Sequence, residues 1–349
     1  MCTLQGSSLA PITICPHQNE RPIIDGDFAI VAGGYVHVRG IEFMYSGWTT
    51  RDQADVASQI NLNRITVSAT GVKFINNVIH NLRMGIYSGV EGTGLEIYGN
   101  IIYYNGYVGT DRGHGHSIYL NNATTIRKII RNNIMFAPFA YGVHLYAENE
   151  GYLTAFDVTE NTVFNSGILA TGFTPRANIL LGGYNVIAEQ SSIVQNSTYQ
   201  QALAKQNQIG YEPGGAATIN VIDNYMPDGL SQINATNITE INNYYGPSVG
   251  DQVFLRVNEY NPNLANLTIY NEAQADNIQV DVSALTTSGI VNAHNVQDYF
   301  NDIQSLEVTD GQIIINMQAV NRTVAKPVGW TAPATTFPSF GCLRLEKIT

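Results

Sequence analysis

The chain has 349 residues and a formal net charge of −11, with 17 basic residues against 28 acidic ones. This acidic balance argues against nucleic acid or an anionic membrane surface as a partner. A hydrophobic content of 44%, with 32 glycines and 20 tyrosines, excludes a disordered chain. The 36 asparagines outnumber all acidic residues, so neutral amides supply much of the polarity. Such a composition is typical of a fold with many tight turns.

The first feature along the chain is a repeat that ends each time in asparagine. A short alternating strand leads into Asn77, Asn100, Asn133 or Asn161, and two mostly apolar residues and a ring follow. The spacings are 23, 33 and 28 residues, and weaker copies lie near 192–195, Asn224 and Asn243. The ring positions are occupied by His80, Tyr103, Phe136 and Phe164. We expect these rings to pack in one side-chain column.

A second repeated element lies between these copies, at 85–87, 117–119 and 142–144. The strands alternate with period two, and no helical stretch separates them. A unit of this size cannot bury its own apolar face, so successive units must stack. The sequence therefore predicts a parallel β-solenoid with a hydrogen-bonded asparagine ladder at one turn.

The sequence resembles the right-handed parallel β-helices of the pectate-lyase-like superfamily over roughly residues 8–245. The resemblance rests on the asparagine repeats, on segments 10–14 and 20–26, and on the rung 36–43. It implies an all-β, carbohydrate-active protein. We expect the β-helix to occupy 1–248. The asparagine pattern then stops, and strands starting near 251, 267, 278, 312 and 341 predict a C-terminal antiparallel β-sandwich or cap over 249–349, with a short helical turn near 298–303.

One rung is longer than its neighbours. Asn77 precedes Gly85 by 8 residues, but Asn100 precedes the equivalent Ser117 by 17. The extra residues lie within 106–115 and include Asp111, Arg112 and His114, with His116 directly after. Because functional sites are commonly built on loops added to a rigid scaffold, this insertion is the strongest functional signal in the chain.

Strand parity places further groups beside the insertion. If Ile86, Ile118 and Val143 point into the core, then Tyr87, Tyr119 and His144 point outward and lie above one another. Tyr146 and Glu148 continue the same parity. Aromatic rings with few charges suit a sugar chain, although an external stack that only stabilises the wall is equally consistent with the pattern.

The alternating pair His114 and His116 also raises the alternative of a divalent metal site completed by His144 or Glu148. No second closely spaced ligand pair accompanies it, so the sequence requires no cofactor. The candidate carboxylates near the insertion are Asp111, Glu148 and Glu150, and no paired-Asp signature appears. This favours elimination over hydrolysis, which needs paired carboxylates.

We therefore expect a polysaccharide lyase that cleaves a uronic-acid polymer by β-elimination. Arg112 would pair with the uronate carboxylate, His116 or His144 would be the base, and Tyr119 or Tyr146 the proton donor. The expected substrate-binding residues are Tyr87, Asp111, His114, Lys128, Arg131 and Glu148. The run 113–119, Gly-His-Gly-His-Ser-Ile-Tyr, resembles a run in bacterial β-helix proteins that process polysaccharides.

The alternatives are a glycoside hydrolase or uronate epimerase on the same scaffold, and a non-catalytic polysaccharide-binding or adhesin module. The expected partner is an anionic polysaccharide, bound by a monomer outside the cell or in the periplasm. Residues 1–6 have neither the basic nor the apolar part of a signal peptide, so we expect none in this chain. A bridge between Cys2 and Cys15 is compatible with secretion.

Overall fold

The computed structural model describes residues 1–18, 20–53, 63–149, 151–202 and 204–348. The chain folds into two compact units. The first contains residues 1–246 together with Val328–Trp330, and the second contains 247–327 and 331–349. No helix in the described part of the chain is both long and apolar enough to cross a membrane.

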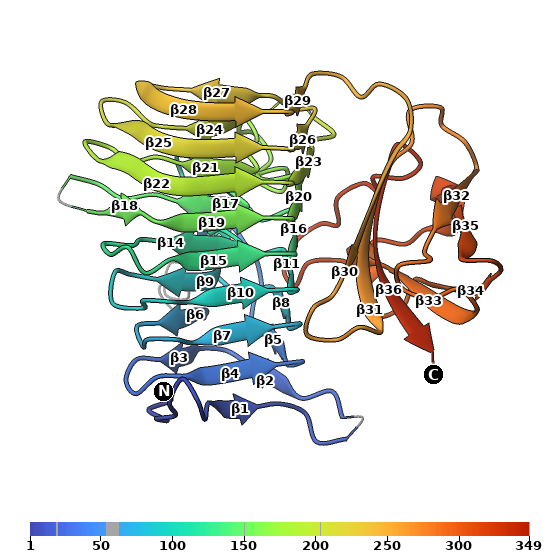
Figure 1. The fold of residues 1–349 in the computed structure, drawn as a ribbon, viewed down its shortest axis with the longest axis horizontal. Helices are drawn as coiled ribbons and strands as arrows, with labels where there is room; N and C mark the ends of the chain where they lie inside the picture. Colours follow the sequence, from blue (N-terminus) through green and yellow to red (C-terminus); the bar gives the residue numbers. More distant parts are fainter. Residues whose placement is uncertain (19, 54–62, 150, 203, 349) are drawn as a thin grey trace. The chain divides into compact units, whose positions relative to one another are not determined.

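The first unit consists of three parallel sheets, here called A, B and C (Figure 1). Sheet A contains β1 (Ile12–Ile14), β4 (Val36–Arg39), β7 (Lys73–Ile75), β10 (Glu96–Tyr98), β15 (Lys128–Arg131), β19 (Phe156–Thr159), β22 (Ile187–Val194), β25 (Gly215–Ile222) and β28 (Ala235–Ile241), and β18 (Leu153–Thr154) pairs with β22. Sheet B contains β2 (Ile23–Asp25), β5 (Glu42–Met44), β8 (Val78–His80), β11 (Ile101–Tyr103), β16 (Ile134–Phe136), β20 (Thr162–Phe164), β23 (Ser197–Tyr199), β26 (Tyr225–Met226) and β29 (Tyr244–Tyr245). Sheet C contains β3 (Phe28–Ile30), β6 (Arg64–Val67), β9 (Met84–Ser88), β14 (Ile118–Leu120), β17 (Val143–Leu145), β21 (Ile179–Leu181), β24 (Asn207–Ile209) and β27 (Leu230–Gln232).

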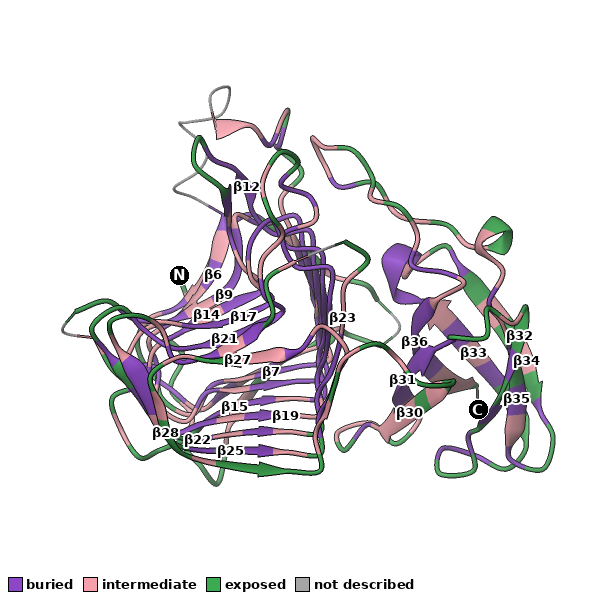
Figure 2. Ribbon diagram, turned by 90° about the horizontal axis from the view of Figure 1, so that it is seen from above, coloured by how far each residue is buried: buried purple, intermediate pink, exposed green. Residues whose placement is uncertain are grey.

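The chain visits the three sheets in a fixed order, A then B then C, and then begins the next rung. Each strand pairs in parallel with the strand one rung away, as β10 does with β7 and β15. This is the predicted right-handed parallel β-helix, whose hand agrees with the strong preference of parallel crossovers. The inward residues of all three sheets form one apolar core, seen as the buried lining of the ring of strands in Figure 2.

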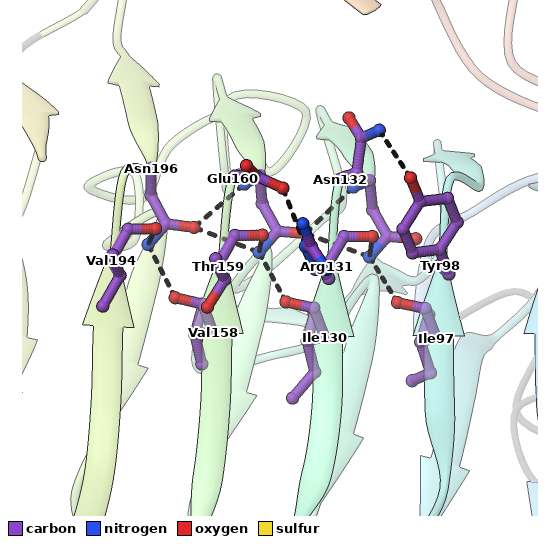
Figure 3. Close-up of polar contacts among 12 residues, drawn as sticks. Ile97, Tyr98, Ile130, Arg131, Asn132, Val158, Thr159, Glu160, Val194 and Asn196 are labelled. Carbon is purple, nitrogen blue, oxygen red and sulfur yellow. Dashed lines mark hydrogen bonds and ion pairs between the residues drawn. The ribbon is translucent and has the colours of Figure 1, made fainter. Parts of the chain in front are cut away.

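The predicted asparagine ladder runs along the turn between sheets A and B (Figure 3). Asn100 donates its side-chain N–H and its backbone N–H to Oδ1 of Asn133, both at 2.9 Å, and Asn133 repeats this toward Asn161. The ladder runs from Asn77 to Asn243. The copy expected near 192–195 was placed a few residues early, because Asn196 occupies that rung.

Backbone geometry explains why each ladder residue follows a sharp turn. The residue before the asparagine adopts a left-handed conformation, with φ of 53° at Asn132, 59° at Glu160 and 54° at Gln195. Asparagine tolerates this conformation better than most residues, which accounts for Asn-Asn pairs. The predicted ring column is also present: His80, Tyr103, Phe136 and Phe164 stack with centroid distances of 4.8–4.9 Å.

The second unit is antiparallel, as predicted, and its two sheets enclose a separate apolar core. One sheet orders β30 (Gln252–Val257), β31 (Leu264–Tyr270), β36 (Phe340–Ile348), β33 (Gly289–Asn295) and β34 (Ile303–Val308), and the other pairs β32 (Asn277–Asp281) with β35 (Gln312–Asn316). Two short 3-10 helices are η1 (Val296–Asp298) and η2 (Ala319–Asn321). The helical turn expected at 298–303 thus lies slightly earlier. Cys2, Cys15 and Cys342 are free thiols.

Candidate functional site

The outward column predicted on sheet C is present. Tyr119 on β14 lies in register with Tyr87 on β9 and with His144 on β17. The ring centroid of Tyr119 is 5.7 Å from that of Tyr87 and 4.9 Å from that of His144. Their inward neighbours, including Ile118, are fully buried. The column therefore presents three rings on the outer face of neighbouring rungs.

The inserted residues form a β-hairpin, with β12 (Tyr107–Val108) antiparallel to β13 (Gly113–His114). Its glycines are required by close packing. A Cβ added at Gly113 would lie 1.8 Å from the carbonyl oxygen of Phe139, and one added at Gly115 would lie 2.3 Å from Cα of Gly106. The Gly-His-Gly-His run thus places glycine where backbones touch.

The base of this hairpin is held by the fully buried guanidinium of Arg51. Its N–H groups donate to the carbonyl oxygen of Gly106 at 2.6 Å, to Asn81 Oδ1 at 2.7 Å and to the carbonyl oxygen of Val328 at 2.8 Å. The guanidinium also lies 4.4 Å from the ring centroid of Trp48. Arg51 therefore fixes the hairpin on the solenoid with neutral acceptors and an aromatic face.

A pocket of about 300 Å³ opens between the hairpin and sheet C. It is lined by Arg112, Gly113, His114, His116, Ala140, Tyr141, His144, Tyr146, Glu148, Arg176, Leu180 and Tyr211. Six of the residues predicted from the sequence line this pocket: Arg112, His114, His116, His144, Tyr146 and Glu148. The pocket thus brings the hairpin next to His144 of the outward column.

Stacked rings form one wall of the pocket. The ring of His144 lies between those of Tyr141 and Tyr146, with centroid distances of 4.5 Å and 5.0 Å and interplanar angles of 2° and 9°. His116 is 4.1 Å from His144, and Tyr211 meets Tyr146 edge-on at 5.4 Å. This packing fixes the orientation of the imidazole of His144.

Both histidines of this wall are held in the neutral form. Burial, followed by the charges of Arg112 and Arg176, lowers the pKa of His144 to about 3. Burial also lowers the pKa of His116 well below its usual value, and the neighbouring His144 adds to this. Neutral imidazoles can accept or donate a proton at one nitrogen each, so the identity of the available nitrogen decides their chemistry.

Hydrogen bonds distinguish the two rings. The backbone N–H of Tyr141 donates to Nδ1 of His116 at 3.2 Å, so neutral His116 carries its proton on Nε2. Nδ1 of His144 is buried and has no hydrogen-bond partner among the described residues, which leaves Nε2 as the nitrogen available to the pocket. His144 is thus better suited than His116 to accept a proton.

The tyrosines of the site are protonated. Burial raises the pKa of Tyr119 to about 12, and burial together with Glu148 raises the pKa of Tyr146 further. The phenol of Tyr146 donates to Oε1 of Glu148 at 3.2 Å. Tyr146 is therefore a proton donor in the free protein. Tyr119 and Tyr87 do not line the pocket, since they stack beside it on neighbouring rungs.

Asp111, the acidic residue of the hairpin, forms its side-chain contacts with other residues of the hairpin. Asp111 accepts from Arg112 Nη1 at 2.5 Å and pairs with His114 Nε2 at 2.8 Å, while the ring of His114 stacks on Tyr107 at 5.2 Å. The hydrogen bond from His114 lowers the pKa of Asp111. Asp111 thus orients Arg112 and His114 and does not line the pocket.

Two predicted binding residues lie elsewhere. Lys128 has an exposed fraction of 0%, and its Nζ donates to Ser88 Oγ at 2.8 Å and to the carbonyl oxygen of Gly89 at 2.5 Å. Arg131 is on sheet A, where its Nε pairs with Glu160 at 2.8 Å. Lys128 and Arg131, which the sequence suggested as substrate-binding residues, therefore lie on a different sheet from the pocket, and Lys128 points inward.

Among the lining residues that the sequence did not predict, three are aromatic or charged: Tyr141, Arg176 and Tyr211. A signal for Arg176 was present. Asn133 precedes Val143 by 10 residues, but Asn161 precedes the equivalent Ile179 by 18, so a second insertion of the same size exists. Tyr141 directly precedes the repeat at 142–144, at the position that His116 occupies one rung earlier, so the repeat marked it, whereas Tyr211 lies in the connection between β24 and β25.

The alternative of a metal site requires a cluster of ligand side chains. Within the residues that the structure describes, no group of three His, Cys, Asp or Glu side chains could hold a metal ion. His114 is paired with Asp111, and His116 accepts a backbone N–H. Glu150, one of the candidate carboxylates, lies outside the described residues.

No protein-family model matches the sequence, and no curated protein matches it. Among solved structures, the chain is similar to a mutant tailspike protein of Escherichia coli bacteriophage HK620 in complex with a hexasaccharide, at 11% identity and a TM-score of 0.37, over 93% of this chain and 61% of that one. It is also similar to the Dettilon tailspike protein, at 14% identity and a TM-score of 0.29, over 93% and 74% of the two chains. A third similar structure is PfbA, a surface adhesin of Streptococcus pneumoniae, at 10% identity and a TM-score of 0.35, over 74% and 83%. The chain thus spans less than two thirds of the HK620 tailspike chain.

Proposed function

We propose that the protein is a polysaccharide lyase that cleaves a uronic-acid-containing polymer by β-elimination in the pocket beside the hairpin. The observation that carries this proposal is the placement of two guanidiniums, Arg112 and Arg176, around the neutral and buried His144. In a chain of net charge −11, two arginines at one pocket favour an anionic ligand.

The first requirement of β-elimination is neutralisation of the uronate carboxylate, because this makes the proton on C5 more acidic. Arg112 and Arg176 both line the pocket and are suited to this task, since a guanidinium offers two parallel donors to a carboxylate. Asp111 pairs with Arg112 and so limits its rotation.

His144 would be the base. Its Nε2 takes the proton from C5, the electron pair forms the C4–C5 double bond, and the bond from C4 to the glycosidic oxygen breaks. In the free protein burial, and after it the charges of Arg112 and Arg176, hold the pKa of His144 low. A bound carboxylate offsets their charge, and this raises the pKa of His144 when substrate is in place. Substrate binding and base strength are thereby coupled.

Tyr146 would be the acid that protonates the departing oxygen. Its phenol is protonated in the free protein, and its contact with Glu148 provides a route by which a proton returns after each turnover. His116 and Tyr119 then act as positioning residues, since their rings contact His144 at 4.1 Å and 4.9 Å.

A second candidate is a non-catalytic polysaccharide-binding module. The low pKa of free His144, about 3, favours this reading. An imidazole with so low a pKa is a weak base, and a binding module needs no base at all. The rigid ring stack from Tyr141 to Tyr146 would serve as a platform for a pyranose face. A hydrolase is less well supported, since Glu148 is the only carboxylate among the described residues that line the pocket.

The test is incubation with a panel of uronic-acid polymers, followed by ultraviolet absorbance of the conjugated product and by a reducing-end assay. A lyase gives both signals, a hydrolase gives only reducing ends, and an epimerase gives neither but exchanges the C5 hydrogen with deuterated water. Binding with no product supports the binding module.

Variants assign the roles. For a lyase, His144→Gln and Tyr146→Phe should each lower kcat by 100-fold or more, on the order of general acid–base contributions. Arg176→Gln should raise KM as well as lower kcat. The matched control is His37→Gln on sheet A, which should retain activity. Full activity in both His144→Gln and Tyr146→Phe would overturn the assignment.

A further inference from the structure

The pocket is one end of a longer row of cationic and aromatic side chains at the edge of sheet C. The row can be traced by backbone contacts from rung to rung. Arg64 is paired with Met84, and the N–H of Arg83 donates to the carbonyl oxygen of Asn63 at 2.8 Å. Arg83 and Arg64 therefore stand at the start of adjacent strands, β9 and β6.

The next rung places His116 beside Arg83. The N–H of Gly85 donates to the carbonyl oxygen of His116 at 3.0 Å, and a Cβ added at Gly115 would lie 2.3 Å from the carbonyl oxygen of Arg83. The row then continues through Tyr141 into the pocket. From Arg64 to Tyr141 there are three rung steps, which is about 14 Å at the spacing of adjacent strands.

Arg64 and Arg83 lie close enough for their charges to interact. The guanidinium of Arg64 lies 4.9 Å from the ring centroid of Tyr87, and its Nε donates to Thr66 Oγ1 at 3.1 Å. Nε of Arg83 is buried and has no hydrogen-bond partner among the described residues. Among the described residues, the acid that acts on the charge of Arg83 is Asp27, which is exposed and accepts the backbone N–H of Arg64 at 2.9 Å.

We infer that Arg64, Arg83 and Tyr87 form a second anion subsite, so that the ligand is an oligosaccharide carrying at least two acidic units several sugars apart. This inference rests on the proposed function in one respect, namely that an acidic sugar binds in the pocket. The ring of Tyr87 lies beside the guanidinium of Arg64 and next to the ring of Tyr119, so it connects the two cations with the aromatic column of sheet C.

The geometry also explains why the subsite recognises charge. A half-buried guanidinium next to another cation is unfavourable, and burial and Arg64 together lower the pKa of Arg83. An anionic group placed between Arg64 and Arg83 relieves this repulsion. A neutral polymer of the same length cannot do so, and it loses affinity relative to a polyuronate.

The experiment measures binding by calorimetry, in the His144→Gln background to prevent cleavage. Oligouronates of increasing length are compared with neutral oligosaccharides of the same lengths. Affinity for the acidic series should rise until the oligomer spans both subsites. Arg83→Gln and Arg64→Gln should each weaken the long acidic oligomers by roughly 10-fold or more and leave the shortest ones unchanged.

The matched control is Arg127→Gln, which removes an arginine paired with Asp157 on sheet A at 2.7 Å and should bind all lengths as the parent does. Arg83→Lys should restore part of the affinity, which separates lost charge from misfolding. Equal affinity for short and long oligomers, or no loss in Arg83→Gln, would overturn the second subsite. Because the experiment measures binding, the second subsite can be confirmed even if the protein forms no unsaturated product. If the protein is a lyase but its affinity does not depend on oligomer length, the second subsite is wrong and the proposed function still stands.

Discussion

Acid should destabilise the β-helix through His144. The pKa of this residue is about 3 in the folded protein, below its ordinary value of 6.5, so the unfolded chain binds the proton more readily. Stability from this group is complete above about pH 6.5 and is lost as the pH falls toward 3. Linkage gives a loss of about 2 kcal/mol between pH 7 and pH 5, and about 3 kcal/mol between pH 7 and pH 4. His116 acts in the same direction.

The assay is urea unfolding at a series of pH values, followed by tryptophan fluorescence. Both tryptophans, Trp48 and Trp330, belong to the first unit, so the signal reports the solenoid. His144→Phe keeps the ring stack with Tyr141 and Tyr146 but cannot titrate, and its stability should fall less steeply with acid. Subtracting the two profiles removes the contribution of carboxylates common to both.

A matched control is His17→Gln, which removes an exposed imidazole and should follow the wild-type profile. The reasoning is refuted if wild type and His144→Phe lose stability in parallel between pH 7 and pH 4. Such a result would mean that His144 is solvated or paired in the folded protein.

Three further substitutions test the scaffold. Asn133→Ala should lower the free energy of unfolding by about 3–5 kcal/mol, because it leaves several buried amide groups unpaired. Asn243→Ala, at the end of the ladder, should lower it clearly less in the same urea titration. Arg51→Met should lower the unfolding free energy by about 3 kcal/mol and weaken sugar binding, and wild-type values for both would contradict its role at the hairpin. Gly113→Ala should displace the hairpin and weaken ligand affinity in calorimetry, while Gly89→Ala, whose Cβ meets only a flexible side chain, should bind as wild type does.

The β-helix could be predicted because its signals are local and repeated. A buried asparagine at the same point of successive rungs completes its side-chain hydrogen bonds only with residues of the adjacent rungs. The repeated asparagines therefore specify that the rungs stack. Parity along the strands placed Tyr119 and His144 correctly for the same reason. The same parity, applied to β15, places Lys128 inward with Ile130, although lysine as a residue type usually faces solvent.

The rest of the site depends on connections whose course the repeat does not determine. Arg176 lies in a long connection between β20 and β21, and its approach to Tyr141, 5.9 Å from the ring centroid, depends on how that connection folds back. The state of His144 is equally non-local, since its pKa depends on burial and on two arginines from different rungs. The sequence alone therefore does not determine the distances between these side chains.

The asparagine ladder also has a direction. From Asn77 to Asn224, each side-chain amide donates to Oδ1 of the ladder residue on the next rung, and each Oδ1 from Asn100 to Asn243 accepts from the previous rung. The amide dipoles therefore add head to tail along the axis, and each bond polarises the next. The solenoid thus carries a built-in electrical polarity parallel to its axis, which neither the neutral asparagines nor the net charge of the chain would suggest.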